Sequence, residues 1–107
     1  MPQIIIRGME IQPVKQMSKE LIDELQQVIG CPRDYFTLEV LPTLFILDGE
    51  EDKGRPFIQI NWFERGQEVQ DKVAKVINRH ARSVGYEAEV FFTVLNENRY
   101  YENGEHY

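Results

Sequence analysis

The sequence PQIII at positions 2–6 returns as PFIQI at positions 56–60, and this repetition decides the fold of the chain. In each copy a proline opens a short run with isoleucines, and such runs are typical of β-strands. Each run is followed by a segment of helical periodicity that ends at a glycine, Gly30 in the first half and Gly85 in the second. The chain therefore carries the same strand–helix pattern twice.

Two amphipathic helices are predicted between these strands and glycines. Their apolar residues recur at steps of three and four positions, as Val14, Met17, Leu21, Leu25 and Val28 in the first half and Val69, Val73, Ile77, Ala81 and Val84 in the second. After each glycine a second strand is predicted, at positions 35–38 and 91–94. The complete repeat is a β-α-β unit of about 50 residues.

Two β-α-β units predict an α+β fold in which a four-stranded sheet carries both helices on one face. The other face of the sheet needs its own cover, because the chain has more aromatic residues than a one-sided layer requires. These residues are Tyr35, Phe36, Phe57, Trp62, Phe63, Phe91 and Phe92. We expect the uncovered face to be buried against other copies of the chain.

A single domain is expected over residues 1–107, since this length supports one core and not two. Within it, the repeats occupy residues 2–47 and 56–95, and a tail follows at residues 96–107. The acidic run at positions 50–52, in the connection between the repeats, is predicted to be a solvated loop tip. An Asn-Gly pair in the tail is typical of a tight hairpin turn.

Composition and charge disfavour several classes of protein. The chain is 42% hydrophobic and 28% charged, which is ordinary for a globular protein. The net charge of −6 disfavours nucleic acid and anionic membrane surfaces as partners, whereas a few local arginines suffice for a small anionic substrate. With no membrane-spanning run, no signal-peptide pattern and one cysteine, a cytoplasmic protein is expected. The spacing of histidine and cysteine predicts no metal site, and no cofactor is expected.

The chemistry of Pro2 depends on the residue before it. If Met1 is removed, Pro2 carries a free secondary amine, which can take a proton from a carbon acid or attack a carbonyl. An α-amino group titrates near neutral pH once its surroundings shift it. If Met1 is retained, the Pro2 nitrogen is a tertiary amide without a basic lone pair. The simpler interpretation is that Pro2 is only a rigid start to a strand.

The sequence IGCPRDYFTLEVLP at positions 29–42, with the duplicated unit and Pro2, resembles the tautomerase superfamily. Within it, the chain is most similar to the two-unit branch typified by macrophage migration inhibitory factor, over nearly its whole length. The sequences GCPR at 30–33, WFERGQE at 62–68 and YYENG at 100–104 resemble still more closely an uncharacterised bacterial domain-of-unknown-function family in the same superfamily.

This resemblance implies a homotrimer in which the sheets form an inner barrel and the helices lie outside. It also implies a pocket at each subunit interface, with the N-terminal proline at its floor. In such enzymes the proline amine is the general base that moves a proton between carbon and oxygen of a small 2-keto acid or enol, while basic side chains hold the substrate carboxylate. A tautomerase is therefore the first expectation for function.

The resemblance assigns the site residues one by one. Pro2 matches the catalytic proline. Cys31 stands where the branch has a substrate-binding lysine, so that contact is missing, and Arg33 is the nearest replacement. Arg65 follows the first strand of the second unit, close to the residues that line the pocket. The sequence is equally consistent with Arg33 and Arg65 as surface residues. For Cys31, the simpler interpretation is an inert thiol.

Aromatic residues complete the expected site. Phe91 and Phe92 stand where the branch places an aromatic residue that reaches into the pocket of a neighbouring subunit. Tyr100 and Tyr101 lie in the C-terminal region that closes the site. The simpler interpretation of these side chains is that they belong to the core and to a subunit interface.

Two alternatives remain open at this point. The first is a non-enzymatic trimer of the same fold that acts as a binding or interaction protein, and the missing lysine at Cys31 favours it. The second is a ferredoxin-like regulator that binds a small molecule, because that fold has the same order of strands and helices. The order of the elements alone does not separate the two folds.

Overall fold

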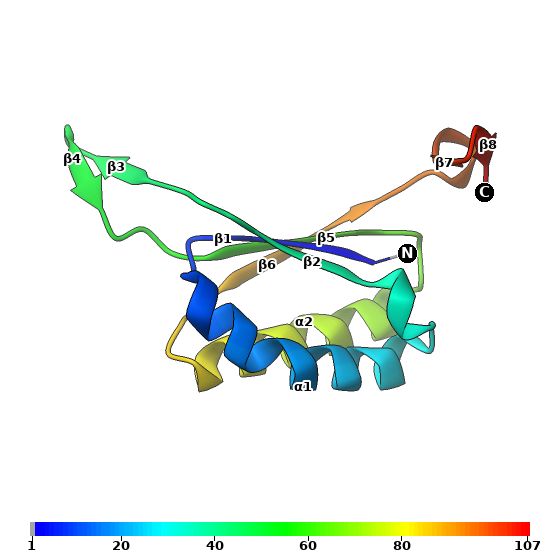
Figure 1. Cartoon of the computed structure of the whole chain (residues 1–107), viewed down its shortest axis with the longest axis horizontal. Coiled ribbons are helices and arrows are strands. Elements are labelled where there is room, and N and C mark those ends of the chain that lie inside the picture. The colour runs from blue at the N-terminus through cyan, green and yellow to red at the C-terminus, as the bar shows by residue number, and fades with distance from the viewer. Residues whose placement is uncertain (1) are drawn as a thin grey trace.

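The computed structural model describes residues 2–107 and contains a four-stranded sheet with two helices on one face (Figure 1). In spatial order the sheet consists of β2 (Thr37–Leu41), β1 (Gln3–Arg7), β5 (Phe57–Trp62) and β6 (Glu89–Val94). The helices are α1 (Ile11–Ile29) and α2 (Gln67–Ser83). The predicted α+β architecture is therefore confirmed.

The two β-α-β units are related by the pairing of their first strands. β1 is parallel to β2 and β5 is parallel to β6, while β1 and β5 are antiparallel and join the units. The Pro2 carbonyl accepts a hydrogen bond from Thr37 N–H at 3.1 Å, and the Pro56 carbonyl accepts one from Glu89 N–H at 3.0 Å. The same contact therefore fixes the start of both units, at opposite ends of the sheet.

This pairing decides between the two folds left open by the sequence. In the split β-α-β arrangement of ferredoxin-like proteins, another strand lies between the two parallel strands. Here the parallel strands of each unit are direct neighbours in the order β2-β1-β5-β6. The ferredoxin-like alternative is therefore wrong.

The helices bury most of the apolar positions that the periodicity singles out, whereas Val28, Val69 and Val84 are only partly buried. In α1 the buried residues are Val14, Met17, Leu21, Ile22 and Leu25, and in α2 they are Val73, Val76, Ile77 and Ala81. The helix α1 ends at Gly30, which has a left-handed φ of 80° and whose N–H donates to the Gln26 carbonyl at 2.8 Å. The predicted glycine stop is confirmed there, because few other residues adopt this conformation without strain.

The core lies between the helices and one face of the two central strands. In β1 and β5 every second residue is buried, so that Ile4, Ile6, Ile58, Ile60 and Trp62 face the helices. Burying an isoleucine side chain contributes about 1.5–3 kcal/mol relative to leaving it exposed, so these strands and helices stabilise each other.

The opposite face of the sheet carries a ladder of hydrogen-bonded polar side chains. Asn61 Nδ2 donates to Gln3 Oε1 at 3.4 Å, and Gln59 Nε2 donates to Asn61 Oδ1 at 2.9 Å. Gln59 also donates to Thr93 Oγ1 at 3.3 Å, and its Oε1 accepts from Arg7 Nη1 at 3.5 Å. This open face is therefore more polar than the aromatic content of the sequence suggests.

The aromatic side chains are divided between the two faces. The rings of Trp62 and Phe92 stack with their centroids 4.9 Å apart on the side that the helices cover, and Phe36 also packs against the core. Only some of the predicted set, including Phe91 at 43% exposure, remains for a partner. Neighbouring residues of a strand face opposite sides, so Phe92 lies on the covered face and Phe91 on the open one.

Two hairpin arms project from opposite ends of the sheet, beyond the open face (Figure 1). The first pairs β3 (Phe45–Leu47) with β4 (Glu50–Asp52), and the second pairs β7 (Tyr101–Glu102) with β8 (Glu105–His106). The second arm confirms the predicted tail hairpin. The first corrects the prediction of a loop tip, because the acidic run is a strand. Its turn has positive φ at Asp48 and Gly49, as two-residue hairpin turns require.

Two short 3-10 helices, η1 (Arg33–Tyr35) and η2 (Glu97–Arg99), precede β2 and the second arm. Tyr35 therefore lies in η1 and not in the predicted strand. The capping of η1 involves the Phe36 N–H, which donates to the Arg33 carbonyl at 3.2 Å. The strand that was predicted at positions 35–38 begins two residues later and extends further, to Leu41.

A three-membered polar contact ties α1 to α2. Arg79 donates to Glu24 from Nη1 at 2.9 Å and from Nη2 at 2.5 Å, and His80 Nε2 lies 2.9 Å from Glu24 Oε1. The hydrogen bonds from Arg79, and then from His80, lower the pKa of Glu24 from 4.5 to about 2. Because the folded state binds this proton less tightly than the unfolded state, the contribution to stability is present above pH 4.5 and is lost as the pH falls toward 2.

We expect the substitution Glu24→Gln to lower the free energy of unfolding at pH 7 by about 1 kcal/mol, because this ion pair is partly solvated. The variant also loses less stability than the parent between pH 4.5 and 2, since it no longer has this carboxylate to protonate. Urea unfolding at a series of pH values measures both effects. Glu20→Gln, on the exposed side of α1, is the control. Parallel pH profiles for Glu24→Gln and the parent would contradict the assignment.

Candidate active site

Pro2 directly precedes β1, and the next residue, Gln3, is hydrogen-bonded to Tyr100, which directly precedes the second arm. The Pro2 side chain is fully buried. The β1–β5 pairing puts Gln3 opposite Asn61, so one step further along the strands Pro2 lies beside Trp62. The predicted removal of Met1 falls outside the described residues. The site is therefore built from what surrounds Pro2.

Trp62 and Arg65 lie at the same end, where the chain leaves β5. The Arg65 Cζ atom is 5.6 Å from the centroid of the Trp62 ring, which is a cation–π distance. Arg65 Nε and Trp62 Nε1 are both buried, and neither has a hydrogen-bond partner within residues 2–107. Buried donors are rarely left unpaired in proteins, and each costs about 1–3 kcal/mol, so this end of the sheet is unusual.

An aromatic cluster anchors the second arm beside these residues. Phe63 contacts the rings of Tyr100 and Tyr107, with centroids 5.4 and 5.2 Å apart, and the two tyrosine rings are 5.2 Å apart. The Tyr100 hydroxyl accepts a hydrogen bond from Gln3 Nε2 at 3.2 Å, directly next to Pro2 in the chain. The sequence singled out Tyr100 but missed Phe63 and Tyr107 as its partners.

A cavity of about 330 Å³ lies beside this cluster and is lined by Asp34, Tyr35, Thr37, Glu102 and Tyr107. Tyr107 donates its hydroxyl to Glu102 Oε2 at 2.5 Å. The hydrogen bond to this carboxylate raises the pKa of Tyr107 to about 12, so the phenol stays protonated at neutral pH. The backbone of Thr37 connects the cavity to Pro2 through their hydrogen bond.

The remaining predicted residues lie in several different places. Arg33 Nη1 is 2.5 Å from Asp23 Oδ1, and Arg33 Nη2 donates to the Lys19 carbonyl at 3.4 Å, so its guanidinium is bound to α1. The hydrogen bond from Arg33, and then that from Lys19 Nζ, lower the pKa of Asp23. Cys31 is a half-buried free thiol just after the Gly30 cap.

The aromatic candidates are also spread out. Phe92 reaches the Pro2 end by stacking on Trp62, whereas Phe91 points to the open face of the sheet. Tyr101 is 60% exposed on the second arm, where its ring faces His106 with centroids 6.0 Å apart. Of the predicted site residues, Arg65, Phe92 and Tyr100 are thus grouped around the start of β1 with Pro2.

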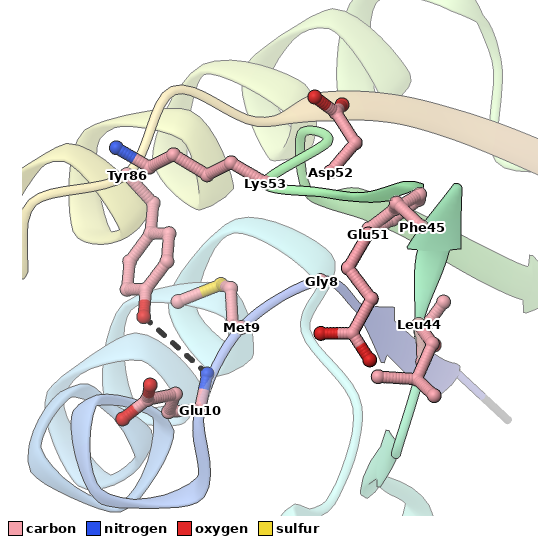
Figure 2. A pocket seen from close by; sticks show the side chains of 10 residues that line it. Gly8, Met9, Glu10, Leu44, Phe45, Glu51, Asp52, Lys53 and Tyr86 are labelled. Carbon is pink, nitrogen blue, oxygen red and sulfur yellow. Dashed lines mark hydrogen bonds between the residues drawn. The ribbon is translucent and has the colours of Figure 1, made fainter. Parts of the chain in front are cut away.

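A second pocket, of about 270 Å³, lies at the opposite end of the sheet (Figure 2). Figure 2 shows Tyr86 with its hydroxyl accepting from Glu10 N–H at 3.4 Å, and the first arm closing the other side with Phe45, Glu51, Asp52 and Lys53. The base of this arm is tightly packed, because a Cβ on Gly54 would lie 2.3 Å from the Phe45 ring. In this pocket the carboxylates outnumber the single lysine, so the pocket is unsuited to an anionic substrate.

The two ends of the sheet thus differ in the chemistry that they offer. The nearby proline at the second pocket is Pro56, whose Cα would lie 2.9 Å from a Cβ on Gly8. Pro56 is internal to the chain, so its nitrogen is a tertiary amide. Within residues 2–107, the end with Pro2 combines a buried proline with Arg65 and two buried donors that lack a partner.

No set of three or more histidine, cysteine, aspartate or glutamate side chains within residues 2–107 is arranged to hold a metal ion. Likewise, no helix of these residues is long and apolar enough to cross a membrane.

Comparisons with known proteins agree with this architecture. A family model described as Domain of unknown function (DUF1904) matches residues 1–106. A solved DUF1904 domain from Sebaldella termitidis is 39% identical, with 100% of both chains covered and a TM-score of 0.93. No curated protein matches the chain.

More distant solved structures share the fold. A macrophage migration inhibitory factor-like protein from Entamoeba histolytica is 18% identical, covers 99% of this chain and 98% of its own, and has a TM-score of 0.74. A fused 4-OT symmetric trimer is also 18% identical, with 98% and 94% covered and a TM-score of 0.70. By its match over nearly the whole length, the chain belongs to the DUF1904 family of domains of unknown function, and its fold is that of the tautomerase superfamily.

Proposed function

We propose that the chain is an isomerase that moves a proton between carbon and oxygen of a small 2-keto acid or its enol, with the Pro2 amine as the general base. The observation that carries the proposal is the position of Pro2, buried at the end of the sheet beside Arg65 and the tyrosine cluster. The tautomerase fold, which the chain shares, supports it.

The residues around Pro2 suit this chemistry. Burial disfavours the charged form of an amine, so an amine at Pro2 is unprotonated at neutral pH and able to accept a proton from carbon. The Arg65 guanidinium is suited to the substrate carboxylate, because its planar fork matches two carboxylate oxygens. Its charge also stabilises the enolate that develops as the proton leaves carbon.

We further propose that the working form is a homotrimer. Leu44, Ile46 and Leu47 on the first arm are 77%, 72% and 60% exposed, which is more apolar surface than a free arm normally presents. Phe91 adds apolar area on the open face of the sheet. The fused 4-OT structure, which shares the fold, is a symmetric trimer and supports the same arrangement here.

One observation favours a second candidate function, a non-enzymatic trimer that binds a partner or a small molecule. Arg33, the expected replacement for the missing lysine at Cys31, is bound to Asp23 on α1. Arg65 is then the one predicted basic residue at the Pro2 end. A site with a single cation holds an anion but stabilises an enolate less than a site with two.

The test is an assay of phenylpyruvate tautomerisation and 2-hydroxymuconate ketonisation, on protein whose mass shows that it begins at Pro2. We expect a rate well above the uncatalysed reaction and a large loss on Pro2→Ala. Arg65→Met raises KM, because it removes the carboxylate partner, while Arg33→Met serves as the matched arginine control. No activity above background, in protein that light scattering shows to be assembled, would contradict the isomerase and favour the binding protein.

A further inference from the structure

We propose that Trp62 is a positioning residue for the Pro2 amine, and that its indole N–H donates a hydrogen bond to the neutral nitrogen of Pro2 once Met1 is removed. This inference rests on the proposed function: the hydrogen bond favours the neutral amine in the resting site, and it breaks when the Pro2 lone pair takes the proton from carbon. It assigns a role to a residue that neither the repeat pattern nor the resemblance singles out as functional.

The first observation is the unpaired indole donor. Trp62 is 1% exposed, and its Nε1 has no hydrogen-bond partner within residues 2–107. Water cannot supply the partner from bulk solvent, because the nitrogen is covered. A donor that is buried without an acceptor destabilises the fold, so a nearby acceptor is expected in the mature protein.

The second observation is the relation between Trp62 and Pro2 in the sheet. The antiparallel register pairs Gln3 with Asn61 and Ile4 with Ile60, so continuing it by one step sets Pro2 opposite Trp62. Both residues are fully buried, on the side of the sheet that also buries Ile4 and Ile60. Directly opposite residues in antiparallel strands have Cβ atoms about 4.5–5.5 Å apart, which is within reach of an indole ring.

The third observation is the change that loss of Met1 makes at this position. With Met1 attached, the Pro2 nitrogen is an amide and accepts no hydrogen bond. Without Met1, the Pro2 nitrogen becomes a secondary amine with one lone pair. This lone pair can accept a hydrogen bond from the Trp62 indole N–H. A donor to the lone pair stabilises the neutral amine and disfavours its protonated form, which cannot accept.

The indole ring is held firmly enough to act in this way. It stacks on Phe92 with an interplanar angle of 30°, and Arg65 lies over it at 5.6 Å. Gln3, whose side chain lies on the open face of the sheet, and Tyr100 are hydrogen-bonded to each other beside Pro2, while α1 and α2 bring no buried polar or charged side chain among the described residues. Among the described residues, Arg65 is the cation that lies against the Trp62 ring, and its charge also disfavours protonation of the amine.

The composition of the chain makes the idea directly testable, because Trp62 is its single tryptophan. The indole N–H gives one resonance in a proton–nitrogen NMR spectrum, and this resonance is followed against pH. In the chain that begins at Pro2, we expect it to titrate in one step together with the Pro2 carbons, observed in protein with carbon-labelled proline. In a chain with one alanine added before Pro2, the indole resonance stays constant over the same range.

A matched pair of variants separates the hydrogen bond from the packing. Trp62→Phe keeps an aromatic ring on Phe92 but removes the donor, and we expect it to raise the pKa of the Pro2 amine by about one pH unit. Phe92→Leu disturbs the stack but keeps the donor, and the amine pKa stays near that of the parent. Arg65→Met also raises the amine pKa, but this effect shrinks with added salt, whereas that of Trp62→Phe does not.

These measurements do not depend on enzymatic turnover. They can therefore overturn the inference about Trp62 whether or not the protein is an isomerase. An unchanged amine pKa in folded Trp62→Phe, or an indole resonance that ignores the titration of Pro2, would overturn the inference even if the protein is an active tautomerase. A shifted amine pKa in protein without activity would support the inference and remove the isomerase. In active protein, the acidic limb of the kcat/KM profile moves with the amine pKa.

Discussion

Adding one alanine before Pro2 lowers kcat/KM for phenylpyruvate by about 10²–10⁴-fold relative to the same chain beginning at Pro2. The added residue converts the secondary amine into an amide, and an amide nitrogen has no lone pair that can take a proton. Nothing else at the site needs to change, because Pro2 keeps its ring and its carbonyl keeps the hydrogen bond to Thr37 N–H. The loss therefore appears in kcat, with KM held near its original value by Arg65.

The measurement compares two proteins of verified mass in a continuous absorbance assay. Pro2→Ala, which begins with a primary amine, is expected to fall between them, since it retains a weaker base at a less rigid position. Thermal unfolding confirms that all three proteins are folded. Equal rates for the extended and the unextended chain would show that the Pro2 nitrogen is not the base.

Truncating Leu21 to alanine is expected to destabilise the protein by about 2–5 kcal/mol, the range for buried leucines. Leu21 is completely buried at the centre of α1, where it packs with Leu25 and the isoleucines of β1 and β5. The loss is a large part of the total stability of a domain of this size, which is about 5–15 kcal/mol. Urea unfolding of the parent and the variant gives the difference directly.

Leu44→Ala is the matched control, since it removes the same atoms from a leucine that is 77% exposed on the first arm. In the isolated chain it changes the free energy of unfolding by less than about 0.5 kcal/mol. In a trimer that buries the arm, the same substitution weakens assembly, and sedimentation at decreasing protein concentration detects this as earlier dissociation. If Leu21→Ala and Leu44→Ala lowered the free energy of unfolding of the isolated chain by similar amounts, the placement of Leu21 in the core and of Leu44 outside it would be wrong.

The repeat was predictable because its signals are local. A proline followed by isoleucines, apolar residues at helical spacing and a glycine at the end of a helix each act through neighbouring residues, and both copies carry them. The left-handed φ of 80° at Gly30 shows the same local rule at work. The first arm was missed because the acidic residues at 50–52 have low strand propensity, although the pair Asp48-Gly49 before them is typical of a turn.

The site was less predictable because its contacts join distant parts of the chain. Arg33 was a reasonable anion-binding candidate until Asp23, ten residues earlier on α1, took its guanidinium. The contact of Phe63 with Tyr107 depends on how the second arm folds back, which no spacing rule describes. Trp62 could have been singled out as the only tryptophan, but its unpaired nitrogen is visible only once the strands are paired.

The matching hydrogen bonds at the carbonyls of Pro2 and Pro56 bear on how one end of the sheet came to differ from the other. The two units are built alike, and the order in which the gene is read decides which proline can be a terminus. A circular permutant that opens the chain before Pro56, with a linker joining the old ends near the second arm, would make Pro56 the terminal proline, at the end of the sheet where carboxylates outnumber the single lysine. Activity of this permutant, with Pro56 as its first residue, would show that either end of the sheet can support catalysis. The position of the N-terminus alone would then decide which proline reacts.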